Sequence, residues 1–217
     1  MNPGIEQRIM ELLFSHLCHE LISPVTAVNN GLELVTEDDP GMVAEAIGLI
    51  RQSAAEAARK LQFYRLAYGQ ASGFEQARGL IQARELSQGL FQGSRIALSW
   101  NDGDAGGVAA DKQSVKLLLN LIGLAREALP RGGTIAVALS RRAPNLHADV
   151  TCQGAGARLS PELQAAMAAD VDTEALTART VHAYLVAWLD RGLEAGLSVD
   201  VGAPDRVTFR VMLKPSE

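Results

Sequence analysis

The sequence predicts a chain of two parts: an antiparallel hairpin of two long helices, followed by an α+β domain whose helices cover one face of a mixed sheet. The first part rests on apolar residues that recur every three or four positions between Phe14 and Tyr68. The second part rests on a change of rhythm after Gly79, where alternating segments typical of strands are interspersed with helical segments. We place the boundary between residues 1–76 and 77–217.

The first helix presents a single apolar stripe and ends at a loop rich in acids, over residues 36–41. Pro40 in that loop suits the first turn of the next helix. The apolar positions of the second helix alternate at spacings of four and three, as in a coiled coil. The stripe comprises Phe14, Leu17, Leu21, Val25, Val28, Leu32 and Val35, and the seam of the second helix comprises Val43, Ile47, Ile50, Ala54, Ala57, Leu61, Tyr64 and Tyr68. Because one hairpin leaves its outer apolar surface uncovered, we expect two copies to pair as a homodimeric four-helix bundle.

The remaining elements follow from local patterns and capping residues. Asp111 is placed to cap a strong helix, and Ser160 is placed to cap a shorter one that begins at Pro161. The sequence predicts helices over residues 84–91, 111–129, 161–168 and 177–193, and strands over residues 96–100, 134–140, 147–152, 197–201 and 206–213. The last two strands form a hairpin.

Composition and charge exclude several classes of function. The chain has a net charge of −5, and residues 1–50 contain eight acidic residues and one basic residue, Arg8. Such a balance argues against nucleic acid or anionic lipid as a partner. No apolar run is long enough to cross a bilayer, and the first residues do not resemble a signal peptide. Because Cys18 and Cys152 cannot form a disulfide framework, we expect a cytoplasmic protein.

One polar stripe runs along the first helix, away from the apolar one. At about 100° per residue, His19 lies about 160° from the apolar stripe. The residues at helical spacing beside it are His16, Ser23, Thr26 and Asn30. An exposed imidazole is largely neutral near pH 7 and is a competent nucleophile. Glu20 follows directly, and we expect its carboxylate to orient the His19 ring or to accept a proton from it.

Pro24 adds a second feature to this helix. A proline has no N–H, so the carbonyl of Glu20, four residues earlier, loses its usual helical donor. The helix should therefore loosen or bend one turn after His19. On these residues alone, an ordinary surface histidine remains the simplest alternative, and a metal site shared by His16, Cys18 and His19 is disfavoured because Cys18 points elsewhere.

The segment over residues 15–25, SHLCHELISPV, resembles the phosphorylation box of sensor histidine kinases, with His19, Glu20 and Pro24 at the matching positions. His16 lacks the following acid and the proline at the right distance. The second domain resembles the ATP-binding domain of these kinases, with Asn120 at the first asparagine of the asparagine box.

The same resemblance marks the residues that are missing. Leu124 stands where the kinases have the asparagine that contacts nucleotide and metal, and Cys152 stands where they have the aspartate that reads adenine. A glycine-rich lid strip is absent from residues 177–184. A phosphoacceptor helix joined to a degenerate kinase domain is similar to the ChpT-type histidine phosphotransferases of bacterial cell-cycle phosphorelays, over nearly the whole chain.

This resemblance implies a specific reaction. His19 would accept a phosphoryl group from the receiver domain of a hybrid kinase and pass it to the aspartates of response regulators, without binding ATP. It implies no cofactor of the chain's own, because the receiver partner would supply Mg²⁺. His16, Ser23, Thr26, Asn30 and Leu12 are then the expected partner-binding residues, although Leu12 suits bundle packing equally well.

Two alternatives stay open at this point. The chain could be an authentic ATP-dependent histidine kinase, or a non-catalytic dimeric adaptor derived from one. The sequence does not say whether a phosphatase activity accompanies the transfer, because Glu20 and Ser23 are also placed like the residues that position water in bifunctional kinases.

Overall fold

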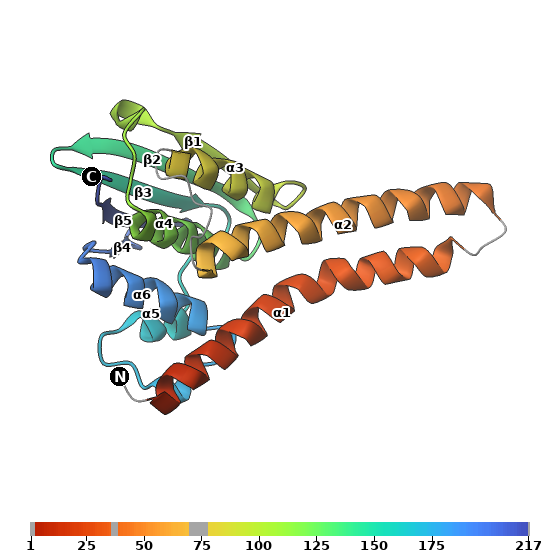
Figure 1. Ribbon diagram of the computed structural model, residues 1–217, viewed down its shortest axis with the longest axis horizontal. Helices are drawn as coiled ribbons and strands as arrows, with labels where there is room; N and C mark the ends of the chain where they lie inside the picture. Colours follow the sequence, from red (N-terminus) through yellow and green to blue (C-terminus); the bar gives the residue numbers. More distant parts are fainter. Residues whose placement is uncertain (1–2, 36–38, 70–77, 217) are drawn as a thin grey trace.

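The computed structural model describes residues 3–35, 39–69 and 78–216. The chain folds into a long helical hairpin that projects from an α+β part containing one mixed sheet (Figure 1). The predicted boundary between residues 76 and 77 lies outside the described residues, as do residues 36–38 of the predicted loop. None of the helices in the described part of the chain combines the length and apolar character needed to cross a membrane.

The hairpin consists of α1 (Pro3–Leu34) and α2 (Pro40–Tyr68), which lie side by side (Figure 1). The entry of α2 is built as the sequence predicts. Asp39 is its N-cap and accepts a hydrogen bond from the Gly41 amide at 2.8 Å, and Pro40 follows in the first turn. Pro24 lies inside α1 and is buried.

The α+β part contains a five-stranded sheet with the order β1-β2-β3-β5-β4. Only β1 and β2 pair in parallel, and the other neighbours are antiparallel, so the predicted mixed sheet is confirmed. The strands are β1 (Ile96–Asn101), β2 (Gly133–Arg142), β3 (Asn145–Gln153), β4 (Ser198–Asp200) and β5 (Arg206–Leu213). The last two form the predicted hairpin.

The helices of this part are α3 (Gly79–Phe91), α4 (Lys112–Ala125), α5 (Pro161–Met167) and α6 (Val181–Leu193), with short 3-10 turns η2 (Gly103–Ala105), η3 (Arg126–Ala128) and η4 (Thr173–Ala175). Asp111 caps α4 by accepting from the Gln113 and Ser114 amides, and the Ser160 hydroxyl accepts from the Leu163 amide at the start of α5. Both caps were predicted. However, α3 begins five residues earlier than predicted and α6 begins four residues later, because residues 177–180 form a turn closed by Thr180.

The hairpin and the α+β part share one hydrophobic core. Phe63 and Ala67, near the end of α2, are fully buried in the same cluster as Leu119 of α4 and Phe209 of β5. Side chains of α4 also bind the last carbonyls of α2, which have no partner within their own helix. Asn120 donates to the Ala67 carbonyl at 2.7 Å, and Lys116 donates to the Tyr68 and Gly69 carbonyls. The base of the hairpin is therefore fixed to the α+β part.

Candidate functional site

His19 lies in the middle of α1 and its side chain is exposed. Ser23, Thr26 and Asn30 are exposed as well, so these residues form the surface stripe that the helical spacing predicts. Among the described residues, none is hydrogen-bonded to the His19 imidazole. A ring in this setting is open to an approaching partner and carries no bond that a reaction would first have to break.

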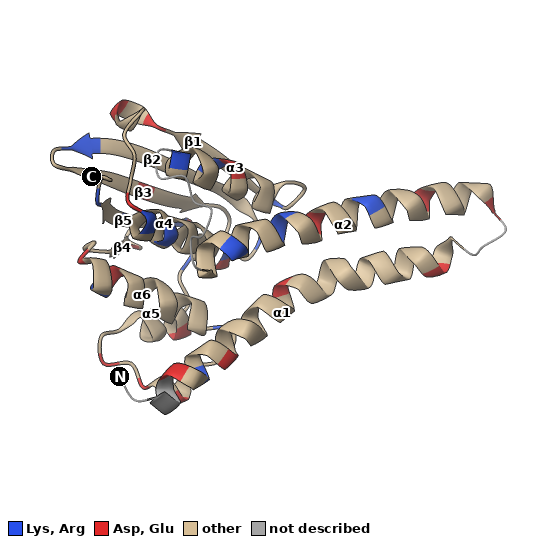
Figure 2. Cartoon of the chain, viewed as in Figure 1, with Lys and Arg blue, Asp and Glu red and all other residues tan. Residues whose placement is uncertain are grey.

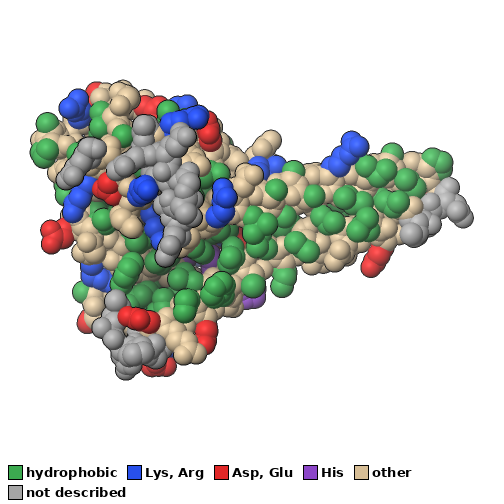
Figure 3. Space-filling model, viewed as in Figure 1, with side chains coloured by type: hydrophobic (Ala, Val, Ile, Leu, Met, Phe, Trp, Pro, Cys, Tyr) green, Lys and Arg blue, Asp and Glu red, His purple; other side chains and the backbone are tan. Residues whose placement is uncertain are grey.

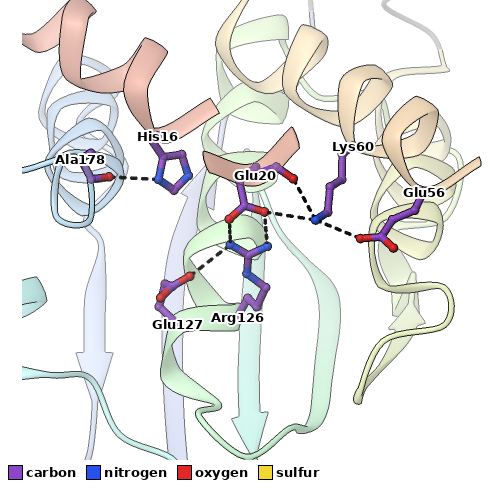
Figure 4. Close-up of polar contacts among 7 residues, drawn as sticks. All are labelled: His16, Glu20, Glu56, Lys60, Arg126, Glu127 and Ala178. Carbon is purple, nitrogen blue, oxygen red and sulfur yellow. Dashed lines mark hydrogen bonds and ion pairs between the residues drawn. The ribbon is translucent and has the colours of Figure 1, made fainter. Parts of the chain in front are cut away.

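His16 departs from the prediction, which placed it on the same exposed stripe. Its side chain is only 8% exposed, and its Nδ1 atom lies 3.1 Å from the carbonyl oxygen of Ala178 (Figure 4). The prediction that His16 is exposed is therefore wrong. The segment before α6 crosses α1 at this turn and covers His16, which the periodicity of α1 alone does not reveal. In this position His16 joins α1 to the second part of the chain and presents no surface to a partner.

Arg8, near the start of α1, also connects this helix to the second part of the chain. Its guanidinium donates to the backbone carbonyls of Thr173, Glu174 and Leu176, the second of these at 2.7 Å. Leu12 is half-buried and packs against the hydrophobic core, so the structure favours the packing interpretation of Leu12 over that of a docking contact. The first half of α1 thus rests on the segment over residues 173–178.

Glu20 also lies differently from the prediction that it orients His19. Neighbouring residues on a helix do not face each other, and Glu20 points toward the second part of the chain. Its carboxylate accepts two hydrogen bonds from Arg126, at 2.7 and 2.6 Å, and lies 3.7 Å from the Lys60 ammonium (Figure 4). The expectation that Glu20 holds the His19 ring is therefore wrong in this structure.

The charge of Glu20 is strongly stabilised in this position. Burial alone would raise the pKa of the carboxyl, but the hydrogen bonds and charge of Arg126, together with the charge of Lys60, outweigh it and lower the pKa to about 2. Only 15% of the Glu20 side chain is exposed. At neutral pH the carboxylate is ionised and fully engaged, so it is a structural anion and no base for His19.

A second buried cluster flanks the first. The His16 ring lies 5.2 Å from the ring of His182 in α6, between centroids, and both pack against Tyr68. The Nε2 atoms of both histidines have no hydrogen-bond partner among the described residues. Burial lowers the pKa of His16, and it lowers the pKa of His182 to about 3. Both rings are consequently neutral at pH 7, and the joint between α1 and α6 carries no charge there.

Arg126, Lys60 and His182 are the residues of this region that sequence reasoning missed. A signal for one of them existed. Pro24 leaves the Glu20 carbonyl without a helical donor, and Lys60 donates to that oxygen at 3.0 Å. The partner of the Glu20 carboxylate, in contrast, lies 106 residues away in the sequence, where no local pattern indicates it.

The positions that the kinase resemblance assigned to nucleotide contacts are core positions here. Leu124 and Cys152 are both fully buried, and the Cys152 thiol donates to the Ala125 carbonyl at 3.4 Å. A cavity of about 1020 Å³ does lie between η3, α5 and residues 170–180, but neither residue lines it. The side-chain amide of Asn120 donates to the Ala67 carbonyl at the end of α2, as described above. Among the described residues, no group of three or more His, Cys, Asp or Glu side chains is placed to hold a metal ion.

Each of three comparisons with known proteins finds a phosphotransferase among the relatives of this chain. Residues 80–205 match the family model for the histidine phosphotransferase C-terminal domain. The chain is 33% identical over 192 residues to a protein phosphotransferase named ChpT from Brucella abortus (strain 2308), covering 88% of each chain. A solved structure of a bacterial phosphotransferase is similar with a TM-score of 0.79 and 30% identity, covering 94% of this chain and 95% of that one.

Proposed function

Because the chain belongs to the histidine phosphotransferase family, we propose that His19 accepts a phosphoryl group from the receiver domain of a hybrid kinase and passes it to aspartates of response regulators. The observation that carries the proposal is the exposed, unbonded imidazole of His19 on an open helix face. A receiver presents its aspartate on its own surface, so the nucleophile has to be reachable without a pocket.

In the forward step, the unprotonated ring nitrogen of His19 bonds to phosphorus while the bond between phosphorus and the aspartate oxygen breaks. The oxygen leaves with the bonding pair as a carboxylate, and the proton stays on the other ring nitrogen. Such transfers depend on in-line placement and charge compensation. We assign the compensating Mg²⁺ to the receiver, and we assign no cofactor to this chain.

The docking surface that we propose is the exposed stripe around His19. It includes Ser23, Thr26 and Asn30, and excludes His16 and Leu12 because both pack against the second part of the chain. The α1 helix carries few charges along this stretch (Figure 2). Small polar groups on such a surface suit recognition by shape and by hydrogen bonds.

We propose that the active form is a homodimer paired through the hairpins. Large apolar side chains gather along both helices on the face in Figure 3. Over all faces of the two helices, the exposed large apolar side chains are Met10, Phe14, Ile22, Val25, Leu32 and Leu34 of α1 and Met42, Ile47, Leu49 and Leu61 of α2. A groove of about 730 Å³ opens among Phe14, Leu17, Leu61 and Tyr68. A continuous apolar surface of this kind favours burial against another chain, and the spacing of the stripe fits a four-helix bundle.

The experiment that tests the transfer uses a phosphorylated receiver domain, the wild-type chain and a His19→Ala variant, with ATP alone as the control. The proposal expects label on the wild type only with the phosphorylated receiver, and none on the variant. Label from ATP alone would make the chain an authentic kinase. If the His19→Ala variant supported as much phosphoryl transfer to response regulators as the wild type, the chain would be an adaptor. We place the reaction in the cytoplasm, where such receivers act.

A further inference from the structure

The contact between Lys60 and Pro24's turn of α1 has a role beyond holding the fold. Pro24 cannot donate a backbone hydrogen bond, so the Glu20 carbonyl, next to His19 in the chain, lacks its helical partner. The Lys60 ammonium of α2 donates to that oxygen at 3.0 Å (Figure 4). A side chain of the neighbouring helix therefore takes the place of the missing amide.

The geometry points to Lys60 as a positioning residue for His19, and this inference rests on the proposed function. The lysine side chain is 14% exposed and its three N–H donors face three acceptors. These are the Glu20 carbonyl, the Glu20 carboxylate at 3.7 Å and the Glu56 carboxylate at 3.0 Å. Contacts from both helices therefore hold the ammonium at the carbonyl.

The consequence concerns the turn that carries the nucleophile. A helix interrupted by proline is free to bend at the turn before it unless another group completes the hydrogen bonding. The Lys60 bond closes this turn, while Arg126 of η3 holds the Glu20 side chain. The backbone turn that carries His19 is therefore held in one orientation toward a receiver, which favours in-line transfer, since a displacement of about 1 Å can cost about a hundredfold in rate.

The test compares the effect of Lys60→Met in the wild-type chain with its effect in the Pro24→Ala variant. Lys60→Met removes the donor and keeps the length of the side chain. Pro24→Ala restores an amide that can donate to the Glu20 carbonyl within α1. We expect Lys60→Met to lower the single-turnover rate of transfer to His19 by about tenfold or more, with little change in receiver affinity. In the Pro24→Ala background the same substitution should cost less than about threefold.

Hydrogen–deuterium exchange gives a readout that does not depend on transfer. Lys60→Met should speed the exchange of amides over residues 20–28, and Pro24→Ala should reverse this. Lys112→Met, at an exposed lysine of α4, is the matched control and should change neither quantity. If Lys60→Met does not fold, Lys60→Leu replaces it, because leucine also lacks a donor and keeps an aliphatic side chain at this position.

An equal loss of rate in both backgrounds, or no loss in either, would overturn the positioning role. A wild-type chain that is never labelled on His19 would overturn the proposed function, and the positioning role would fall with it. Hydrogen–deuterium exchange over residues 20–28 would still show whether Lys60 stabilises this turn, because it does not depend on transfer to His19.

Discussion

Removing the guanidinium of Arg126 should destabilise the whole chain, because it leaves the Glu20 carboxylate buried with one cation fewer. The perturbation is Arg126→Met, which keeps the aliphatic length. Arg126 donates both hydrogen bonds to Glu20, at 2.7 and 2.6 Å, and the two side chains are only 26% and 15% exposed. Lys60 stays in place, 3.7 Å from the same carboxylate.

The magnitude follows from the pKa of Glu20, which is about 2 in the folded chain against an ordinary 4.5. That difference corresponds to roughly 3 kcal/mol in favour of the folded state at neutral pH. Arg126 supplies the larger part of it, so we expect Arg126→Met to lower the free energy of unfolding by about 2 kcal/mol. The value stays below the range for a fully buried pair because both side chains retain some exposure.

The assay is urea unfolding at pH 7 and at constant chain concentration, since the proposed dimer would unfold in a concentration-dependent way. A Glu20→Gln, Arg126→Met double variant should cost less than the two single variants together. Arg142→Met is the control, because Arg142 is exposed and forms no ion pair with a described residue. A loss below about 0.5 kcal/mol for Arg126→Met, typical of a surface pair, would refute the reasoning.

The dependence on pH checks the same account. Because the pKa of Glu20 is lowered on folding, its contribution is fully present above about pH 4.5 and is lost as the pH falls toward 2. The difference between wild type and Arg126→Met should therefore shrink below pH 4.5. A difference that stays constant across that range would mean that the substitution acts through packing alone.

Three further predictions concern the contact between α1 and α6, the contact between α4 and α2, and the proposed dimer. The pKa of His182 is about 3 in the folded chain, so only the unfolded chain binds a proton at this residue as the pH falls below 6.5. The His182→Gln variant should therefore lose about 1 kcal/mol less free energy of unfolding than the wild type between pH 7.5 and 5.5, measured by urea unfolding. An equal loss in the two chains would contradict this prediction. Asn120→Ala leaves the Ala67 carbonyl without its buried donor and should cost about 1–3 kcal/mol in the same assay; a neutral result would argue against the α4 contact. Phe14→Glu should halve the mass measured by light scattering, Trp188→Glu on α6 should not, and equal masses for all three chains would reject the hairpin interface.

Sequence patterns predicted those features of the fold that are local. The caps at Asp111 and Ser160 are confirmed because a capping side chain and its amides lie within three residues of one another. The helical hairpin and the mixed sheet are confirmed because periodicities of 3.6 and 2 distinguish helices from strands. The predicted start of α6 was wrong because the sequence of the turn closed by Thr180 continues the helical pattern of the residues that follow it.

The candidate site was predictable only as far as one helix carries it. Spacing along α1 placed His19, Ser23, Thr26 and Asn30 on a common exposed face. The same spacing failed for His16, because whether a helix face is exposed depends on what packs against it, and the covering segment at Ala178 lies far along the chain. The role of Glu20 was missed for the same reason, since its partners come from α2 and η3.

The most direct test of the central claim is to locate the phosphoryl group on the chain after reaction with a phosphorylated receiver. The intact linkage can be mapped by fragmentation mass spectrometry under neutral to alkaline conditions, which preserve phosphohistidine. The account predicts the group on His19 and on no other residue of the wild-type chain. A phosphoryl group on His16, His147 or His182, with His19 unmodified, would contradict it.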